Sequence, residues 1–199
     1  GEGIWNVTGL HVDGEVYPAK PSDNPFEDVT EDNWFFDPVL WAVENGITVG
    51  TSDTTFSPND TCTRAQVVTF LWRAAGKPEP ETADNPFEDV AEGIWYYDAV
   101  LWAVEKGITV GTSDTTFSPN DTCTRAQVVT FLWRAEGKPE PQGKATAFTD
   151  VPSGAYYFTP VLWAVENGIT VGTSDTTFSP NEGCTRAQVV TFLYRDMKD

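Results

Sequence analysis

The chain has 199 residues, of which 40% are hydrophobic and 13% aromatic, which is enough for a packed core and excludes a disordered protein. Asp and Glu number 30 against 12 Lys and Arg, and the net charge is -18 at pH 7. This charge argues against nucleic acid as a partner and against adsorption to an anionic membrane surface, because both depend on clustered Lys and Arg. No apolar run approaches the roughly 18–20 residues of a membrane-spanning helix, so we expect no membrane insertion.

The first predicted element is a short hairpin within residues 1–22, with its turn at Asp13 and Gly14. His11, the only histidine of the chain, falls in this hairpin, and we expect it to be structural rather than catalytic. We interpret residues 1–22 as a separate hairpin or linker, and we expect the chain to be a piece of a longer protein.

Three repeats follow, which we assign to residues 23–83, 84–144 and 145–199. Two segments, GITVGTSDTTFSPN and CTRAQVVTFL, occur unchanged in all three, and the copies lie 61 residues apart. A unit of this size is marginal as an independent domain, because it buries too little of its surface. We therefore expect the three copies to pack together as one compact, monomeric assembly.

Each repeat opens with a Phe-x-Asp-Val segment and a cluster of three aromatic residues, followed by a predicted first helix that carries VLWAVE. In the first copy, Asp37 and Pro38 fit the N-cap and the first helical position. Thr159 and Pro160 take the same places in the third copy. The helix is predicted to end at a glycine in each copy, at Gly46, Gly107 and Gly168.

A loop with a brief extended start comes next, over residues 47–59 in the first copy. Thr63 and Gln66 then form a capping box, which predicts a second helix that runs to about Gly76. KPEP linkers at residues 77–80 and 138–141 are predicted to be semi-rigid spacers between the repeats. Each repeat is therefore two short helices joined by a structured loop, and the predicted fold class is mainly α.

All six arginines of the chain lie in the predicted second helices. Three of them lie near the C-terminal end, where a cation complements the helix dipole: Arg73, Arg134 and Arg195. The other three take the first helical position: Arg64, Arg125 and Arg186. A cation at that end opposes the dipole, so another interaction must hold these three side chains in place.

The direction of the side chains indicates what that interaction is. At about 100° per residue, Gln66, Thr69 and Arg73 share one polar stripe of the helix. Arg64 falls on the opposite side, in the row of the apolar Val68. We therefore expect its guanidinium at the rim of a groove beside the core, where it can grip a carboxylate through a bidentate fork.

The alternative for Arg64 is an ion pair within the protein, with a carboxylate such as Asp28 or Asp53. A ligand and the protein can also share the guanidinium, which has five N–H donors.

Two further sets of side chains are candidates for sugar binding. The aromatic residues in the loop before the first helix suit stacking on the apolar face of a sugar: Trp34, Trp95 and Tyr156. The loop after the first helix offers hydroxyl and carboxylate partners: Ser52, Ser113, Ser174, Asp53, Asp114 and Asp175. The alternative for this loop is a turn that satisfies itself, with Asp53 bonded to nearby backbone amides.

One cysteine occurs in each repeat, at Cys62, Cys123 and Cys184. No CxxC pair is present, so we interpret the three as buried free thiols; a metal shared by the three about a pseudo-threefold axis is the alternative. No repeat offers a histidine that could activate a Ser or Cys nucleophile, and no nucleotide-binding fingerprint occurs. We therefore expect no enzyme activity, no cofactor and no metal site.

The order of these motifs resembles the S-layer homology domain over residues 26–195. The motifs are Phe-x-Asp-Val, the aromatic cluster, Ala-x-Glu-x-Gly-Ile, Gly-x-x-Asp-x-x-Phe-x-Pro and Thr-Arg-Ala. The resemblance implies a pseudo-threefold, three-pronged unit around a central helical bundle. It also implies non-covalent anchoring of a bacterial surface protein to secondary cell wall polysaccharide, often through a pyruvylated N-acetylmannosamine bound in grooves between prongs.

In this resemblance, the arginine of the family's Thr-Arg-Ala-Glu motif corresponds to Arg64 and its two copies, and the expected location is the bacterial cell surface, cell wall or S-layer. Four departures recur in every copy: Gln66 replaces the usual Glu, Thr51 a Tyr, Thr54 a Gly, and Ser57 a Lys. Losing the Lys removes a cation from the neighbourhood of the groove. The alternative function is therefore a protein-interaction or assembly module that kept the fold without glycan binding.

Overall fold

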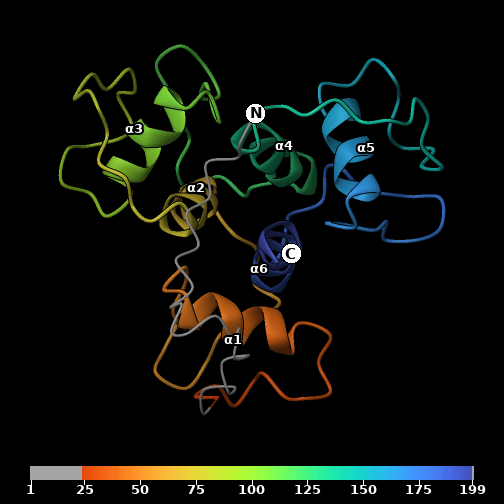
Figure 1. The fold of residues 1–199 in the computed structure, drawn as a ribbon. Coiled ribbons are helices and arrows are strands. Elements are labelled where there is room, and N and C mark those ends of the chain that lie inside the picture. Colours follow the sequence, from red (N-terminus) through yellow and green to blue (C-terminus); the bar gives the residue numbers. More distant parts are fainter. Residues whose placement is uncertain (1–23, 199) are drawn as a thin grey trace, which may run out of the picture.

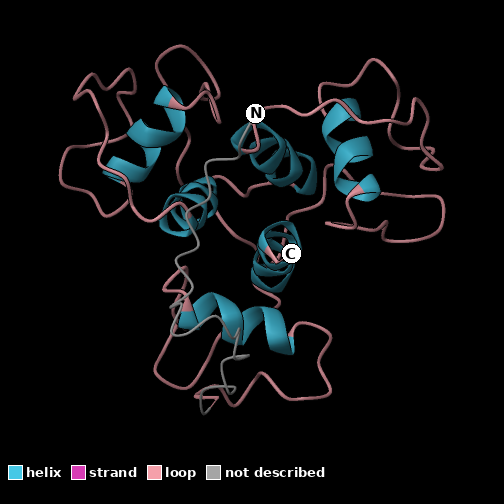
Figure 2. Cartoon of the chain, viewed as in Figure 1, coloured by secondary structure: helices cyan, strands magenta, loops and turns pink. Residues whose placement is uncertain are grey.

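The structure is a computed structural model that describes residues 24–198, so the predicted hairpin and His11 lie outside the described residues. Six α-helices occur in the described part, which has no strand. Their bounds are Phe36–Glu44 (α1), Arg64–Ala74 (α2), Tyr97–Glu105 (α3), Arg125–Ala135 (α4), Phe158–Glu166 (α5) and Arg186–Met197 (α6). The predicted mainly α fold with two helices per repeat is confirmed, and Figure 2 shows how much of each repeat is loop.

The second helices of the three repeats lie at the centre, and the first helices form three arms around them (Figure 1). Each arm packs on the central helix of the preceding repeat: α3 on α2, α5 on α4, and α1 on α6. The last of these contacts closes the ring, because it joins the first repeat to the third. The predicted three-pronged arrangement around a central bundle is confirmed.

The central helices begin with the predicted capping box. The hydroxyl of Thr63 accepts from the backbone N–H of Gln66, whose side-chain oxygen accepts from the N–H of Thr63. A further backbone N–H of the first helical turn has its partner in another repeat. The N–H of Arg64 donates to the carbonyl of Asp121 at 2.9 Å. The same contact recurs in both other repeats, so each central helix depends on its neighbour for its start.

A closed ring of backbone hydrogen bonds lies just before these helices. The N–H of Cys123 donates to the carbonyl of Cys62, that of Cys184 to Cys123, and that of Cys62 to Cys184, each at 2.9 Å. All three cysteines are free and fully buried, which confirms the predicted buried thiols. In the described residues, no group of three or more His, Cys, Asp or Glu side chains is placed to hold a metal ion.

The residue before the cysteine differs in the third copy, and the reason is steric. Thr61 and Thr122 occupy this position in the first two copies, and Gly183 in the third. A Cβ at Gly183 would lie 2.7 Å from the methyl carbon of Thr122 and 2.8 Å from that of Thr61. Two threonines therefore fill the space, and the third copy needs a glycine there.

The predicted N-cap of the first helix is wrong. Helix α1 starts at Phe36, with Phe35 in the N-cap position and no side-chain cap, so Asp37 and Pro38 are its second and third residues. Proline is tolerated there because the N–H groups of the first turn have no partner inside the helix. Thr159 and Pro160 are shifted in the same way in α5.

The predicted glycine stop is confirmed. Gly46 has a φ of 64°, and its N–H donates to the carbonyl of Val43. The N–H of Ile47 donates to Ala42, which completes a Schellman motif.

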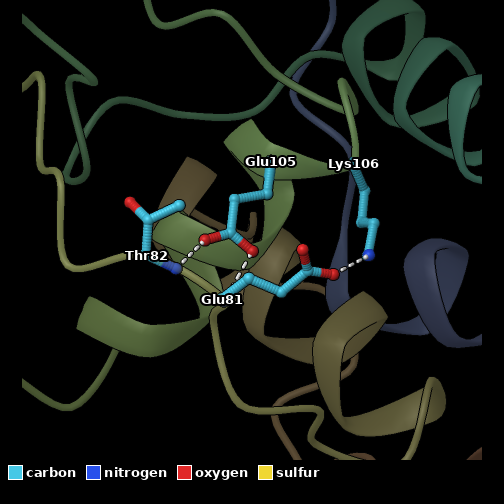
Figure 3. Close-up of polar contacts among 4 residues, drawn as sticks. All are labelled: Glu81, Thr82, Glu105 and Lys106. Atoms are coloured by element: carbon cyan, nitrogen blue, oxygen red, sulfur yellow. Dashed lines mark hydrogen bonds and ion pairs between the residues drawn. The ribbon is translucent and has the colours of Figure 1, made fainter.

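The linkers are held at both ends rather than hanging free. The indole N–H of Trp72 donates to the carbonyl of Pro78 at 2.8 Å. Figure 3 shows the other end, where the carboxylate of Glu105 accepts from the backbone N–H groups of Glu81 and Thr82, at 3.0 and 2.8 Å. Lys106 forms an ion pair with Glu81 beside it, at 3.2 Å. These contacts tie the linker to a helix of each of the two repeats that it joins.

Within the part of the chain that the structure describes, no helix has the length and apolar character that crossing a membrane requires.

Candidate functional site

A groove of about 270 Å³ lies where all three repeats meet, and we call it the Arg64 groove. The first repeat contributes Arg64, the second a loop and one face of α4, and the third an aromatic ring. Its lining residues are Arg64, Thr109, Val110, Gly111, Thr112, Gln127, Thr130, Phe131, Arg134 and Tyr156. This volume is close to the lower end of the range of small-molecule sites.

The guanidinium of Arg64 is buried, not at the rim as predicted: only 3% of the residue is exposed. Its Nε donates to the carbonyl of Phe117 at 2.8 Å, and its Cζ lies 4.8 Å from the centre of that ring. On the other side, the Phe131 ring lies 5.6 Å away. Cation–π contacts and one hydrogen bond therefore hold a charge that opposes the helix dipole.

No carboxylate pairs with Arg64, so the alternative of an ion pair within the protein is wrong. Lys106 and Glu81 form an ion pair in the described part of the chain, whereas Arg64 forms none there. Asp89, the copy of Asp28 nearest to this groove, instead accepts from the backbone N–H groups of Phe117 and Ser118, at 2.8 and 2.7 Å. Burial lowers the pKa of Arg64 from its usual value, although nearby groups such as Cys123 and Asp121 act in the opposite direction.

One donor of Arg64 has no partner. Its Nη2 is buried and forms no hydrogen bond with any described residue. An unpaired buried N–H group of a guanidinium is costly, and it marks a position where an acceptor of a ligand would be bound strongly.

The two equivalent arginines differ from Arg64, although the loops beside them have the same sequence. Nη2 of Arg186 donates to the carbonyl of Val49 at 2.9 Å, and Nη2 of Arg125 donates to the carbonyl of Val171 at 3.2 Å. In the Arg64 groove the corresponding peptide, between Val110 and Gly111, has turned over.

The glycine dihedrals record this difference. Gly111 has a φ of 84°, whereas Gly50 and Gly172 lie outside the left-handed region. We call the Arg64 groove open and the grooves of Arg125 and Arg186 closed. In the closed grooves a loop carbonyl accepts from Nη2 of the arginine. A side chain is excluded in both states, since a Cβ would lie 2.3 Å from a backbone oxygen at Gly50 and 2.6 Å from one at Gly111.

The S-layer homology domain family matches this sequence at residues 25–68, 86–129 and 147–190. The chain belongs to this family. The predicted resemblance and its three tandem copies are confirmed.

Three relatives illustrate where S-layer homology repeats occur. An endoglucanase of Bacillus sp. (strain KSM-635) is 32% identical over 177 residues, which are 85% of this chain and 18% of that protein. The S-layer protein sap of Bacillus anthracis is 28% identical over 199 residues, or 96% of this chain and 24% of that protein. The surface-layer 125 kDa protein of Lysinibacillus sphaericus is 32% identical over 163 residues, or 79% and 13%.

The chain therefore spans less than a quarter of the length of these relatives. The S-layer relatives and the family together confirm the predicted location at the cell surface or cell wall.

One predicted aromatic residue lies beside a helix-start arginine, and the two come from different repeats. Tyr156 of the third repeat lines the Arg64 groove and is 61% exposed. Trp34 of the first repeat lines a pocket with Thr191 and Arg195 of α6. Trp95 is exposed to a similar extent as both. The packing of each arm on a neighbouring repeat brings Tyr156 to the Arg64 groove and Trp34 to the pocket on α6.

The predicted serine and aspartate residues do not line the Arg64 groove. Ser52 satisfies its own turn: its Oγ accepts from the backbone N–H groups of Thr54 and Thr55 and contacts the Thr55 hydroxyl at 2.6 Å. Asp53 is exposed at the tip of the loop. The self-satisfied turn is therefore present, with Ser52 rather than Asp53 bonding the amides. Ser113 and Ser174 make the same hydroxyl contact, and each accepts from one backbone N–H, that of Thr115 and that of Thr176.

Two departures from the S-layer homology pattern contact each other. The hydroxyl of Thr51 lies 2.6 Å from that of Ser57, and the pair recurs in all three copies. Ser57 has a φ of 57°, which its backbone N–H bond to the Asp28 carboxylate helps to hold. A pair of hydroxyls has thus replaced the Tyr and Lys of the family.

Several lining residues were missed as binding residues by the sequence reasoning. Gln127, Thr130 and Arg134 lie on the polar stripe of α4, and the stripe lines the groove of the arginine in the preceding repeat. Arg134 also donates from Nη1 to the carbonyl of Ile108 at 3.0 Å, so it does more than complement the helix dipole. The stripe was visible in the sequence, but the repeat that it faces was not.

Proposed function

We propose that this chain anchors a bacterial surface protein non-covalently to a cell wall polysaccharide. The grooves between repeats bind an acidic sugar of that polysaccharide, with the carboxylate of a pyruvate ketal on an N-acetylmannosamine-type residue as the expected ligand group. The observation that carries the proposal is the buried, unpartnered Nη2 of Arg64 at the groove.

Charge supports an anionic ligand. The Arg64 groove is lined by two cations, Arg64 and Arg134, and by no Asp or Glu, in a chain whose net charge is -18. A carboxylate that accepts from Nη2 would satisfy the donor and neutralise the buried charge in one contact. Gln127 adds to this balance, because a Glu in its place would put a negative charge in the lining.

Shape supports a sugar as the carrier of that carboxylate. Val110 is 72% exposed and Tyr156 is 61% exposed, and both line the Arg64 groove. Large exposed apolar side chains beside a polar groove suit the apolar face of a pyranose ring.

The proposed role is binding without chemistry. The relative named endoglucanase matches this chain over 18% of its length, so this chain corresponds to its S-layer homology part. We attribute no hydrolysis to that part.

The test is a calorimetric titration of the folded chain with purified wall polysaccharide, before and after chemical removal of the ketal. Arg64→Lys keeps the charge but loses the donor fork, and Lys106→Ala, outside the groove, is its control. We expect the native polysaccharide to bind and ketal removal to weaken binding. Arg64→Lys should lower the affinity of one groove about tenfold or more, because a hydrogen bond to a charged group is worth about 1.5–3 kcal/mol.

Equal affinity after ketal removal would refute the carboxylate and indicate a neutral sugar. No binding by the wild-type chain, together with capture of a polysaccharide-free surface protein, would favour the protein-interaction module instead.

A further inference from the structure

One buried threonine in each repeat is bonded to the Val–Gly peptide in both of its states. The residues are Thr48, Thr109 and Thr170, which lie two positions before the glycine and are at most 2% exposed. The three loops have the same sequence, so the comparison of open and closed grooves is internally controlled.

In the closed grooves the threonine hydroxyl is a donor. Thr48 donates to the carbonyl of Val49 at 3.0 Å, and Thr170 donates to the carbonyl of Val171 at 3.1 Å. Each of these carbonyls also accepts from an arginine, Arg186 or Arg125. The carbonyl therefore has two donors in the closed state.

In the open groove the same hydroxyl is an acceptor. The N–H of Gly111 donates to Oγ1 of Thr109 at 3.2 Å. When the Val–Gly peptide turns over, the threonine hydroxyl faces the glycine N–H instead of the valine carbonyl. A hydroxyl can donate to the carbonyl or accept from the N–H, so it bonds the peptide in both states. A valine of the same shape pairs with neither.

We infer that Thr48, Thr109 and Thr170 are positioning residues for glycan binding, because the hydroxyl gives the Val–Gly peptide a partner when the peptide turns over and frees the arginine, as Thr109 does in the open groove. This inference rests on the proposed function. A ligand carboxylate takes the place of the valine carbonyl on the arginine, and the threonine hydroxyl takes up the glycine N–H that the turned peptide presents.

The two states respond unequally to loss of the hydroxyl. In the closed state the valine carbonyl keeps its arginine donor, so it stays satisfied. Nη2 of Arg186 loses only a long contact to Oγ1 of Thr48, at 3.5 Å, and keeps its bond to Val49. In the open state the N–H of Gly111 loses the partner that the structure gives it. Replacing threonine by valine therefore shifts the peptide toward the closed state and weakens ligand binding.

The experiment compares three triple variants with the wild-type chain: Thr48→Val/Thr109→Val/Thr170→Val, the same positions changed to Ser, and the same positions changed to Ala. Affinity for purified wall polysaccharide is measured by calorimetry, and folding by circular dichroism. We expect the Val and Ala variants to bind about tenfold more weakly, which corresponds to about 1.4 kcal/mol, and the Ser variant to bind within about threefold of wild type.

A ligand-free measurement separates this inference from the proposed function. Amide hydrogen exchange followed by NMR should show the Gly111 amide exchanging more slowly than those of Gly50 and Gly172. Thr109→Val should raise the Gly111 rate to the level of the other two, and Thr109→Ser should not.

Wild-type failure to bind polysaccharide would refute the proposed function, and the glycine exchange rates would still decide the role of the threonine. The inference is overturned if a folded Val variant binds as tightly as wild type, or if Thr109→Val leaves the Gly111 exchange rate unchanged.

Discussion

Gly183→Thr should destabilise the fold although it makes the third copy more like the other two. A Cβ at this position lies 2.7 Å from the methyl carbon of Thr122 and 2.8 Å from that of Thr61, well inside van der Waals contact. The ring of cysteine hydrogen bonds next to it closes the bundle, so the backbone has little room to yield. Overpacking of this kind costs about 1–3 kcal/mol.

The assay is urea or thermal unfolding of the purified chain. For a domain of this size, about 1 kcal/mol shifts the melting temperature by about 2–4 °C, so we expect a loss of about 2–12 °C. Gly154→Thr is the matched control, because nothing lies within 4 Å of a Cβ at that exposed glycine.

A second substitution tests the geometry itself. If one of the three positions must be small, Thr122→Gly should recover most of the stability that Gly183→Thr loses. The double variant then unfolds at a higher temperature than Gly183→Thr alone. Wild-type stability of Gly183→Thr, or no recovery in the double variant, would refute this account of the axis.

Three further outcomes are expected. Tyr156→Ala should weaken binding to wall polysaccharide about threefold to tenfold and leave the melting temperature unchanged, since the ring is 61% exposed; a lower melting temperature with unchanged affinity would make the ring structural. Glu105→Gln should lower the free energy of unfolding by about 0.5–1.5 kcal/mol, because its carboxylate accepts two linker N–H groups, whereas the exposed Glu92→Gln should not; equal effects in urea unfolding would contradict the linker clamp. Burial raises the pKa of the Cys62 and Cys123 thiols to about 12, so the folded state keeps them neutral while the unfolded chain ionises them, and stability should fall by about 1.4 kcal/mol per thiol between pH 8 and 10; a triple cysteine-to-alanine variant with the same decline would exclude this cause.

The local elements could be predicted from the sequence because their signals are local. Thr63 and Gln66 lie within one helical turn, and Gly46 ends its helix through its own dihedral angle. The error at Asp37 has the same origin, since Asp-Pro is a good helix start in isolation. In the structure Phe35, two residues before Asp37, takes the N-cap position. Its carbonyl accepts from the N–H of Val39, and its side chain is buried in the core.

The site could be predicted only in part, because each groove is built from three repeats. Arg64 was found from its conflict with the helix dipole, and Tyr156 from its place in a loop. That these two meet follows from the packing of each arm on the preceding central helix, which no local pattern encodes. The two states of the Val–Gly peptide, at Gly111 and at Gly50, could not be predicted from the sequence, because loops of identical sequence adopt both.

The most direct test of the account is a crystal structure of the chain with an acidic fragment of the wall polysaccharide. We predict a ligand carboxylate oxygen about 3 Å from Nη2 of Arg64, and the sugar ring against Tyr156. In any closed groove that becomes occupied, the carbonyl of Val49 or Val171 should have left its arginine. A fragment bound with its carboxylate away from Arg64, Arg125 and Arg186 would contradict the central claim.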